Sequence, residues 1–177
     1  MQSLSTLEHG LAEVRRSPTE AGTVELIARR PAEEEREELA EAELDQGKGL
    51  VGDRWSGNLD TQLTLMNARA ASLLAGPRER WAIAGDQLYV DFDLSGANVP
   101  PGTRLRVGSA VIEVSQAPHT GCGKFARRFG VDALKFVNSP EGRAHNLRGL
   151  NAKIVDGGTV RTGDSIRKLA SDAPRSS

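Results

Sequence analysis

Alternating hydrophobic and polar positions recur in short stretches along the chain and predict β-strands. A period of two residues is typical of a strand that buries one face. The stretches are residues 23–28, 62–66, 88–94, 104–107, 110–114, 152–155, 159–161 and 165–169. Two pairs of neighbouring stretches predict hairpins, one around residues 108–109 and one around residues 156–158. So many strands with glycine-containing turns indicate a closed or nearly closed barrel, a mainly β (β-rich α+β) fold with a few short peripheral helices.

Helical spacing is confined to short segments. Leucine and valine recur every three or four positions near the N-terminus, and Ser5 with Glu8 forms a capping box, which predicts a helix over about residues 5–16. We expect this helix to pack on the barrel or on a partner subunit. Further short helices are expected from Asn67 to Leu74 and around residues 124–137.

The segment 31–44 is rich in glutamate and favours either a solvated helix face or an acidic loop. Aspartates beside glycine, such as Asp86, are expected to cap turns. We divide the chain into an N-terminal helical extension (1–22), a barrel domain (23–169) and a disordered tail (170–177).

Composition narrows the class of protein. With 23 basic and 24 acidic side chains in 177 residues, the net charge of −1 argues against a nucleic-acid partner. The chain lacks both a long apolar run and the features of a signal peptide, so we expect no membrane association and a cytoplasmic location. A single cysteine cannot form an intrachain disulfide, which agrees with a reducing compartment.

That cysteine, Cys122, lies in the most unusual segment of the chain. It stands between two glycines and is followed by Lys124, Arg127 and Arg128. Nearby positive charge and the start of a helix both favour thiolate over thiol. A thiolate can act as a nucleophile, carry sulfane sulfur as a persulfide, or bind a soft metal. The alternative interpretation is a small buried hydrophobic residue.

Histidine and arginine supply the remaining candidates. His119, three residues before Cys122, could activate the thiol or ligate a metal, or it could hydrogen-bond to a backbone carbonyl at a strand end. Arg143, His145 and Arg148 lie beside turn glycines, where arginines could bind phosphate or could be ordinary surface charges.

Several segments, taken in order, resemble the MOSC domain family (the molybdenum cofactor sulfurase C-terminal domain), as a stand-alone bacterial-type member. The resemblance covers about residues 23–169, most of the chain. The segments that carry it are GKGLVGDR, QLTLMN, GDQLYVDFDLSGANVPPG, RLRVGSAVIEVSQAPHTGCGKF and LRGLNAKIVDGGTVRTGDSI.

The resemblance implies a β-barrel and a cysteine that ligates molybdenum or carries sulfur, a position that Cys122 occupies. We take His119, from its position near Cys122, as a second catalytic candidate. For a bound molybdenum cofactor, Lys124, Arg148 and Arg54 are the candidates to bind its anionic groups. Family members often have Pro-Cys where this chain has Gly-Cys, so the reaction is left open.

Three functions follow from the resemblance as alternatives. The first is a molybdenum-cofactor oxidoreductase that reduces small N-hydroxylated or N-oxygenated compounds. The second is a sulfur carrier that receives a persulfide from a cysteine desulfurase. The third is a non-catalytic binding module. A desulfurase or redox partner and a small-molecule substrate are implied, pyridoxal phosphate is not expected on this chain, and both a monomer and a homodimer remain open.

Overall fold

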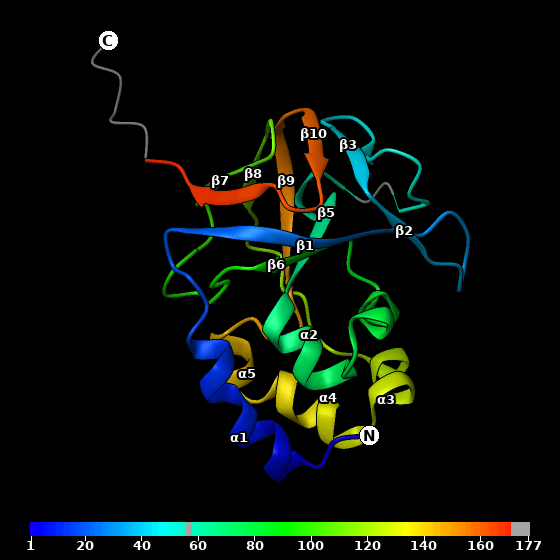
Figure 1. Ribbon diagram of the computed structural model, residues 1–177, viewed down its shortest axis with the longest axis vertical. Helices are drawn as coiled ribbons and strands as arrows, with labels where there is room; N and C mark the ends of the chain where they lie inside the picture. The colour runs from blue at the N-terminus through cyan, green and yellow to red at the C-terminus, as the bar shows by residue number, and fades with distance from the viewer. Residues whose placement is uncertain (56–57, 171–177) are drawn as a thin grey trace.

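Seven strands form a closed, mixed β-barrel. The structure, a computed structural model, describes residues 1–55 and 58–170. Within them the barrel runs β11, β7, β8, β9, β5, β6, β1, and it closes because β1 also pairs with β11 (Figure 1). The strands are β1 (Ala21–Arg29), β5 (Leu63–Asn67), β6 (Leu88–Asp91), β7 (Arg104–Val107), β8 (Ala110–Val114), β9 (Leu150–Asp156) and β11 (Ser165–Lys168). The β5–β6 pair is parallel and the other pairs are antiparallel, and the barrel with short helices confirms the predicted fold class.

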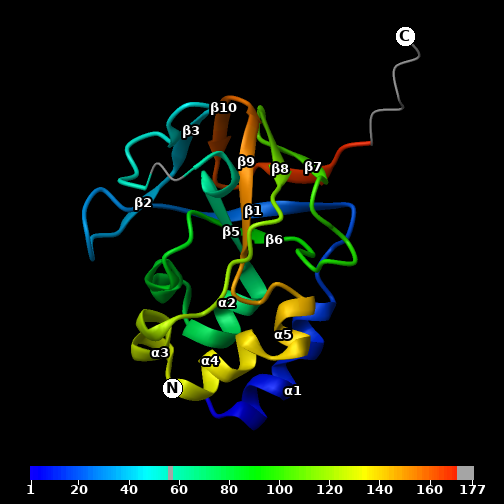
Figure 2. The ribbon, with the colours of Figure 1, turned by 180° about the vertical axis from the view of Figure 1, so that it is seen from behind.

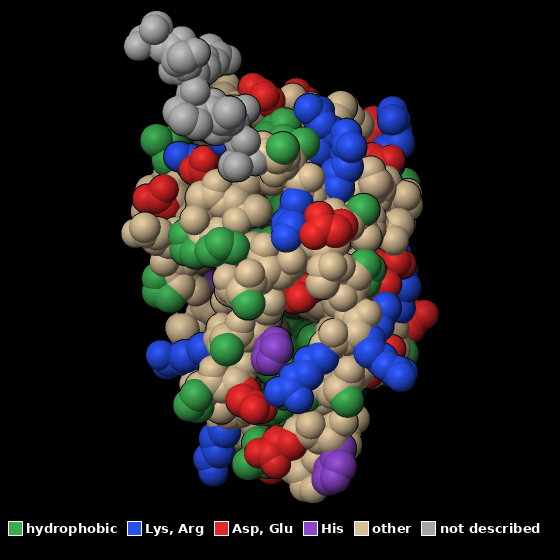
Figure 3. Space-filling view, turned by 90° about the vertical axis from the view of Figure 1, so that its left-hand side faces the viewer, with side chains coloured by type: hydrophobic (Ala, Val, Ile, Leu, Met, Phe, Trp, Pro, Cys, Tyr) green, Lys and Arg blue, Asp and Glu red, His purple; other side chains and the backbone are tan. Residues whose placement is uncertain are grey.

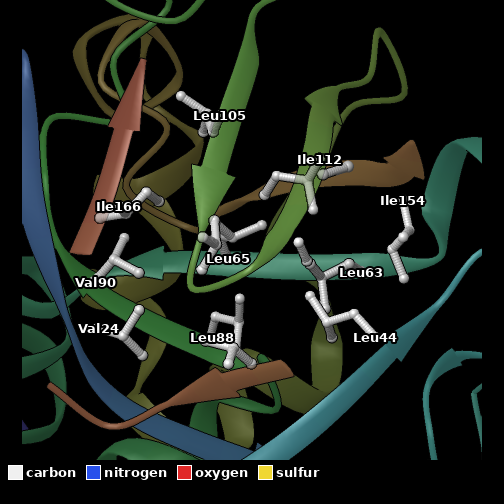
Figure 4. Packing of buried hydrophobic residues seen from close by; sticks show 14 of the residues in the cluster. Val24, Leu44, Leu63, Leu65, Leu88, Val90, Leu105, Ile112, Ile154 and Ile166 are labelled. Carbon is white, nitrogen blue, oxygen red and sulfur yellow. The ribbon is translucent and has the colours of Figure 1, made fainter. Parts of the chain in front are cut away.

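The barrel interior is filled by aliphatic side chains from every strand. Leu63, Leu65 and Leu88 are fully buried, and Figure 4 shows them pointing toward residues of the opposite wall such as Ile112 and Ile166. Alternation explains this arrangement, since every second residue of a strand faces the same side. Strand β5 is buried along its whole length, because its other face lies against helices.

A helical layer covers one end of the barrel (Figures 1 and 2). Its apolar side chains form a second core in which α1 packs on α2 and α4. The helices of this layer are α1 (Leu4–Arg15), α2 (Ala68–Ala75), α3 (Gly123–Phe129), α4 (Val131–Asn138) and α5 (Pro140–Ala144), with the 3-10 helix η2 (Arg78–Ala84). The 3-10 helix η1 (Leu59–Thr61) lies instead against strand β9. The expected N-terminal helix is confirmed, and it packs within this chain through the buried Leu7, Leu11 and Val14.

The helix expected around residues 124–137 is divided into α3 and α4. Gly130 separates them with a φ of 97°, a left-handed value that glycine adopts without strain. Asn67 caps α2 as predicted, because its side-chain oxygen accepts from the N–H groups of Arg69 and Ala70.

The predicted hairpin around residues 156–158 is wrong. β9 already has β8 and β5 as its two neighbours, so the chain turns at Gly157 and leaves the barrel sheet. β10 (Gly158–Arg161) instead pairs with β3 (Glu41–Asp45), which also pairs with β4 (Gly49–Leu50) in a separate small sheet. The hairpin around residues 108–109 is confirmed as β7–β8.

The acidic segment forms a loop followed by strands, so its helical alternative is wrong. β2 (Glu37–Leu39) pairs with the end of β1, and Leu39 packs against the barrel core. Burial of this leucine and pairing with β1 override the helix propensity of the glutamates. Residues 31–36 form the loop that connects β1 to β2.

The surface carries charges of both signs. Figure 3 shows Lys and Arg side chains interspersed with Asp and Glu over one face of the molecule. No helix within residues 1–55 and 58–170 combines the length and apolarity that crossing a membrane requires. Residues 171–177 of the predicted tail lie outside the described residues.

Candidate functional site

Cys122 lies at the end of an extended segment, residues 115–122, that joins β8 to α3 and that we call the strap (Figure 2). Side-chain amides hold the strap in place. Asn138 accepts from the Gly121 N–H at 3.0 Å and donates to the Gly121 carbonyl at 3.2 Å. Asn151 donates to the carbonyls of Ala117 and Pro118 at 3.2 and 3.3 Å. The position of Cys122 is therefore fixed by helix α4 and strand β9.

The Cys122 side chain is exposed and occupies the N-cap position of α3. The pKa of its thiol is lowered, chiefly by the backbone N–H of the nearby Phe125 at the start of α3, although the sulfur makes no capping hydrogen bond to this helix. Partial burial opposes this effect, while the N–H of Lys124 and the charges of Arg148 and Arg128 lower the pKa further. These groups stabilise the thiolate, which is the reactive and metal-binding form of cysteine.

A buried carboxylate, Asp86, lies beneath the strap and connects two of the predicted site residues. Its side chain is 0% exposed, and it binds His119 Nε2 at 3.0 Å and Arg148 Nη1 at 2.5 Å. Burial raises the pKa of the Asp86 carboxyl, but Arg148 and His119 outweigh burial and hold the pKa below its ordinary value. Because an ionised carboxylate only accepts hydrogen bonds, His119 Nε2 must carry a proton, which leaves Nδ1 as the second functional nitrogen.

Arg148 links this network to the cysteine. Its Nη2 donates to the Ala84 carbonyl at 3.0 Å, and its guanidinium carbon lies 5.2 Å from the centre of the Phe125 ring. Its charge contributes to the lowered pKa of Cys122. Its Nε is buried and has no hydrogen-bond partner among the described residues.

Three more arginines surround the turn at Gly85. Arg30 Nη1 donates to the Gly85 carbonyl at 2.9 Å, and Arg36 Nε donates to a carbonyl of η2 at 3.2 Å. A Cβ placed on Gly85 would lie 3.6 Å from Arg128 Nη1 and 3.8 Å from Arg36 Nη2. The pKa of Arg36 is lowered by burial first and then by repulsion from Arg128 and Arg30. These three arginines together with Arg148 are called the arginine cluster below. Arg30 is paired with the buried Asp53 at 3.1 Å and Arg148 with Asp86, so Arg36 and Arg128 are the members whose donors suit an anionic ligand.

The acidic loop supplies carboxylates to the same region. Glu33 lies 3.5 Å from Lys124, and Glu34 lies 3.3 Å from Arg128. Both glutamates are largely exposed, so these ion pairs are weak and an incoming anion can compete with them. The segment that sequence analysis treated as solvent-facing therefore also contacts the site.

The structure joins two of the five predicted site residues, His119 and Arg148, through Asp86, and the charge of Arg148 also acts on Cys122. Lys124 adjoins Cys122 but is paired with Glu33. Arg54 has an exposed side chain, and only its backbone N–H contacts the site region, by donating to the Arg30 carbonyl at 2.8 Å.

Other site residues were missed by sequence reasoning. Asp86 was expected to cap a turn, and Arg30 and Arg36 were not singled out. They come from distant parts of the chain, and no local spacing signals their convergence. Within residues 1–55 and 58–170, no group of three or more His, Cys, Asp or Glu side chains is placed to hold a metal ion.

Solved structures with the same fold exist. A crystal structure of a hypothetical protein has a TM-score of 0.63 and 21% identity, covering 92% of this chain and 72% of its own. The YuaD protein from Bacillus subtilis has a TM-score of 0.61 and 17% identity, with 86% and 97% covered. YiiM from Escherichia coli has a TM-score of 0.59 and 19% identity, with 85% and 71% covered. At these identities the likeness shows the fold alone.

The sequence itself identifies the family. None of the curated proteins matches it significantly. The family profile of the MOSC domain matches residues 24–167, which include every strand of the barrel except the first three residues of β1 and the last of β11. The chain therefore belongs to the MOSC domain family.

Proposed function

We propose that this protein binds molybdenum cofactor with the Cys122 thiolate as a ligand of the metal. The observation that carries the proposal is an exposed cysteine, with a lowered thiol pKa, beside a cluster of arginines. MOSC domains are associated in general with binding of this cofactor. A thiolate is a soft donor that suits a thiophilic metal.

The residues present fit the cofactor. A pterin cofactor carries a phosphate, and the arginine cluster offers planar guanidinium groups that bind phosphate through paired hydrogen bonds. Arg128 and Arg36 converge on Gly85, where the absence of a Cβ leaves room for an oxyanion. Lys124 becomes available for the same role when Glu33 is displaced. Arg54 is a weaker candidate because its side chain is exposed and makes no side-chain hydrogen bond or ion pair within the described residues.

A reaction that suits this site is the reduction of small N-hydroxylated compounds. Converting N–OH to N–H consumes two electrons and two protons and releases water. The bound cofactor supplies the two-electron redox chemistry, and the electrons come from a redox partner. The His119 imidazole serves as the proton-transfer group at the edge of the site. Its Nε2 is hydrogen-bonded to Asp86, which leaves its Nδ1 to exchange protons with the substrate.

A sulfur carrier is the second candidate, and the exposure of Cys122 favours it. An exposed thiolate can receive sulfane sulfur from the persulfide of a cysteine desulfurase and pass it to a metal centre elsewhere. The third alternative, a non-catalytic binding module, assumes that Cys122 is buried. The observed exposure of Cys122 weighs against it.

The test is production in a host that makes molybdenum cofactor, with molybdenum, pterin and protein mass measured after purification. We expect near-stoichiometric molybdenum and pterin in the wild type and loss of most of the molybdenum in Cys122→Ser. Arg128→Gln is expected to lower cofactor content, and the exposed Arg167→Gln, on β11, serves as the matched control. Absence of molybdenum together with a reductant-sensitive gain of one sulfur on Cys122 would overturn the first candidate in favour of the second. Absence of both would overturn both.

A further inference from the structure

A concavity lies along the strap and shares Arg148 with the arginine cluster. It is a cleft of about 310 Å³ between the strap, helix α5 and the loop 96–101. In Figure 2 the chain leaving β8 and helix α5 lie on the same face of the molecule. The volume is at the lower end of the range that small-molecule sites occupy. We call this concavity the strap cleft.

The walls of the strap cleft are mainly apolar. The residues that provide this surface are Val99, Pro101, Val114, Pro118, Val137 and Leu150. Strand β8, helix α4 and strand β9 hold several of these side chains, so the walls are built on regular elements and are largely preformed. A preformed apolar wall binds the apolar body of a ligand at low entropic cost.

The ionisable side chains of the described residues that line the strap cleft are two arginines and one histidine. Arg143, Arg148 and His119 line it, and within the described part of the chain no Asp or Glu does. Arg143 is exposed, and its Nε donates to the Asn138 carbonyl at 3.0 Å. Its Nη groups face no carboxylate within ion-pair distance among the described residues. Since the Asp86 carboxylate offsets the charge of Arg148, the positive charge of the cleft comes from Arg143, which is complementary to an anion.

Two buried polar atoms without a partner belong to residues of the same cleft. They are Ser115 Oγ and Arg148 Nε, and neither has a hydrogen-bond partner within residues 1–55 and 58–170. The Arg148 Nε is fixed within the buried network, whereas the Ser115 hydroxyl on the cleft wall is available to donate to a ligand. The Ser115 hydroxyl can turn toward the cleft by rotation about χ1.

We propose that the strap cleft binds a small organic carboxylate with an apolar body of about one ring. The carboxylate lies at the Arg143 guanidinium, with Ser115 as an inner donor, and the ring lies against Val114 and Leu150. This site adjoins the cofactor site at Cys122 and does not include the cysteine itself. The two share Arg148 and His119, so a carboxylate in the cleft lies next to the network that contains Asp86.

Isothermal titration with benzoate, and with benzamide as the uncharged analogue, tests the proposal. We expect the wild type to bind benzoate at least about tenfold more tightly than benzamide, which is the effect of a hydrogen bond to a charged group. Arg143→Gln is expected to lose about tenfold for benzoate and little for benzamide. Arg167→Gln, an exposed arginine outside the cleft and likewise without an ion pair among the described residues, is the matched control and should bind as the wild type does.

Ala144→Phe, at the exposed rim of the cleft, should abolish binding of both compounds by filling the space. Ala12→Phe, on the exposed face of α1, controls for the effect of the added ring. If Ala144→Phe does not fold, Ser115→Ala, which removes the inner donor of the cleft, provides a second variant. Equal affinities for benzoate and benzamide, or equal losses in Arg143→Gln and Arg167→Gln, would overturn the proposal. Cofactor-free protein suffices for these titrations, so their result does not depend on whether Cys122 binds molybdenum.

Discussion

The buried ion pairs of Asp86 predict an unusually large cost for a neutral substitution. Asp86→Asn keeps the shape and one acceptor oxygen of the side chain but removes its charge. Arg148, whose side chain is 11% exposed, then carries a buried charge without a carboxylate. Removing one partner of a buried ion pair costs about 3–5 kcal/mol, and we expect the lower end, about 3 kcal/mol, because Asn can still accept one hydrogen bond.

Urea denaturation followed by tryptophan fluorescence measures this cost. With a slope of about 2 kcal/mol per molar urea, a loss of about 3 kcal/mol lowers the midpoint by about 1.5 M. Asp91→Asn is the matched control, since Asp91 pairs with Arg69 in two hydrogen bonds but its side chain is 28% exposed. Solvent screening limits the cost of that substitution to about 1 kcal/mol.

The pH dependence supplies a second test of the same reasoning. The folded-state pKa of Asp86 lies below its ordinary value of 3.8, so its contribution to stability is full above that value. The contribution is lost as pH falls through the lower folded-state pKa. The stability difference between wild type and Asp86→Asn should therefore be constant from neutral pH to about pH 5 and should close only in strong acid. A cost no larger than that of Asp91→Asn, or a difference that persists unchanged into strong acid, would refute the ion-pair argument.

Three further predictions concern the strap and the barrel. The rate at which iodoacetamide alkylates Cys122 should reach half its maximum below pH 9.0, the ordinary thiol pKa. Arg128→Gln should raise the pH of that midpoint, and the control Arg167→Gln should leave it unchanged. Gly22→Ala should destabilise the protein by about 2–3 kcal/mol in urea denaturation, because the new Cβ would lie 2.0 Å from a backbone oxygen of strand β6. Asn138→Ala removes both hydrogen bonds between the Asn138 amide and the strap, so hydrogen exchange of the strap's backbone amides should accelerate. The free energy of unfolding should fall by about 2 kcal/mol. Unchanged exchange would mean that the Asn138 side chain does not hold the strap.

Much of the barrel could be predicted from the sequence, because its strands are short and are specified by the alternation of hydrophobic and polar residues within each of them. Alternation and a Gly-Ser turn are sufficient for β7 and β8, which pair with each other. The β9–β10 hairpin failed because pairing depends on which edges are already occupied, and β10 finds its partner in β3, more than a hundred residues away in sequence. The acidic segment likewise became a strand because of Leu39, whose burial is a tertiary effect.

The candidate site was predictable only where its chemistry leaves a mark in a short segment. Glycines and basic residues around Cys122 pointed to a stabilised thiolate and to the nearby His119, and a turn glycine in a second segment pointed to Arg148. Asp86, which joins them, is preceded by a glycine and has no local mark of burial. Its role arises from a contact across 62 positions to Arg148, which only the folded chain shows.

X-ray absorption at the molybdenum edge tests the central claim most directly. Protein loaded with molybdenum cofactor would be compared with the same protein after Cys122→Ser or after the cofactor is transferred to buffer. If Cys122 ligates the metal, the wild-type spectrum shows one more sulfur scatterer than either comparison. An identical sulfur count in the wild type and in metal-containing Cys122→Ser would contradict the assignment of Cys122 as a ligand.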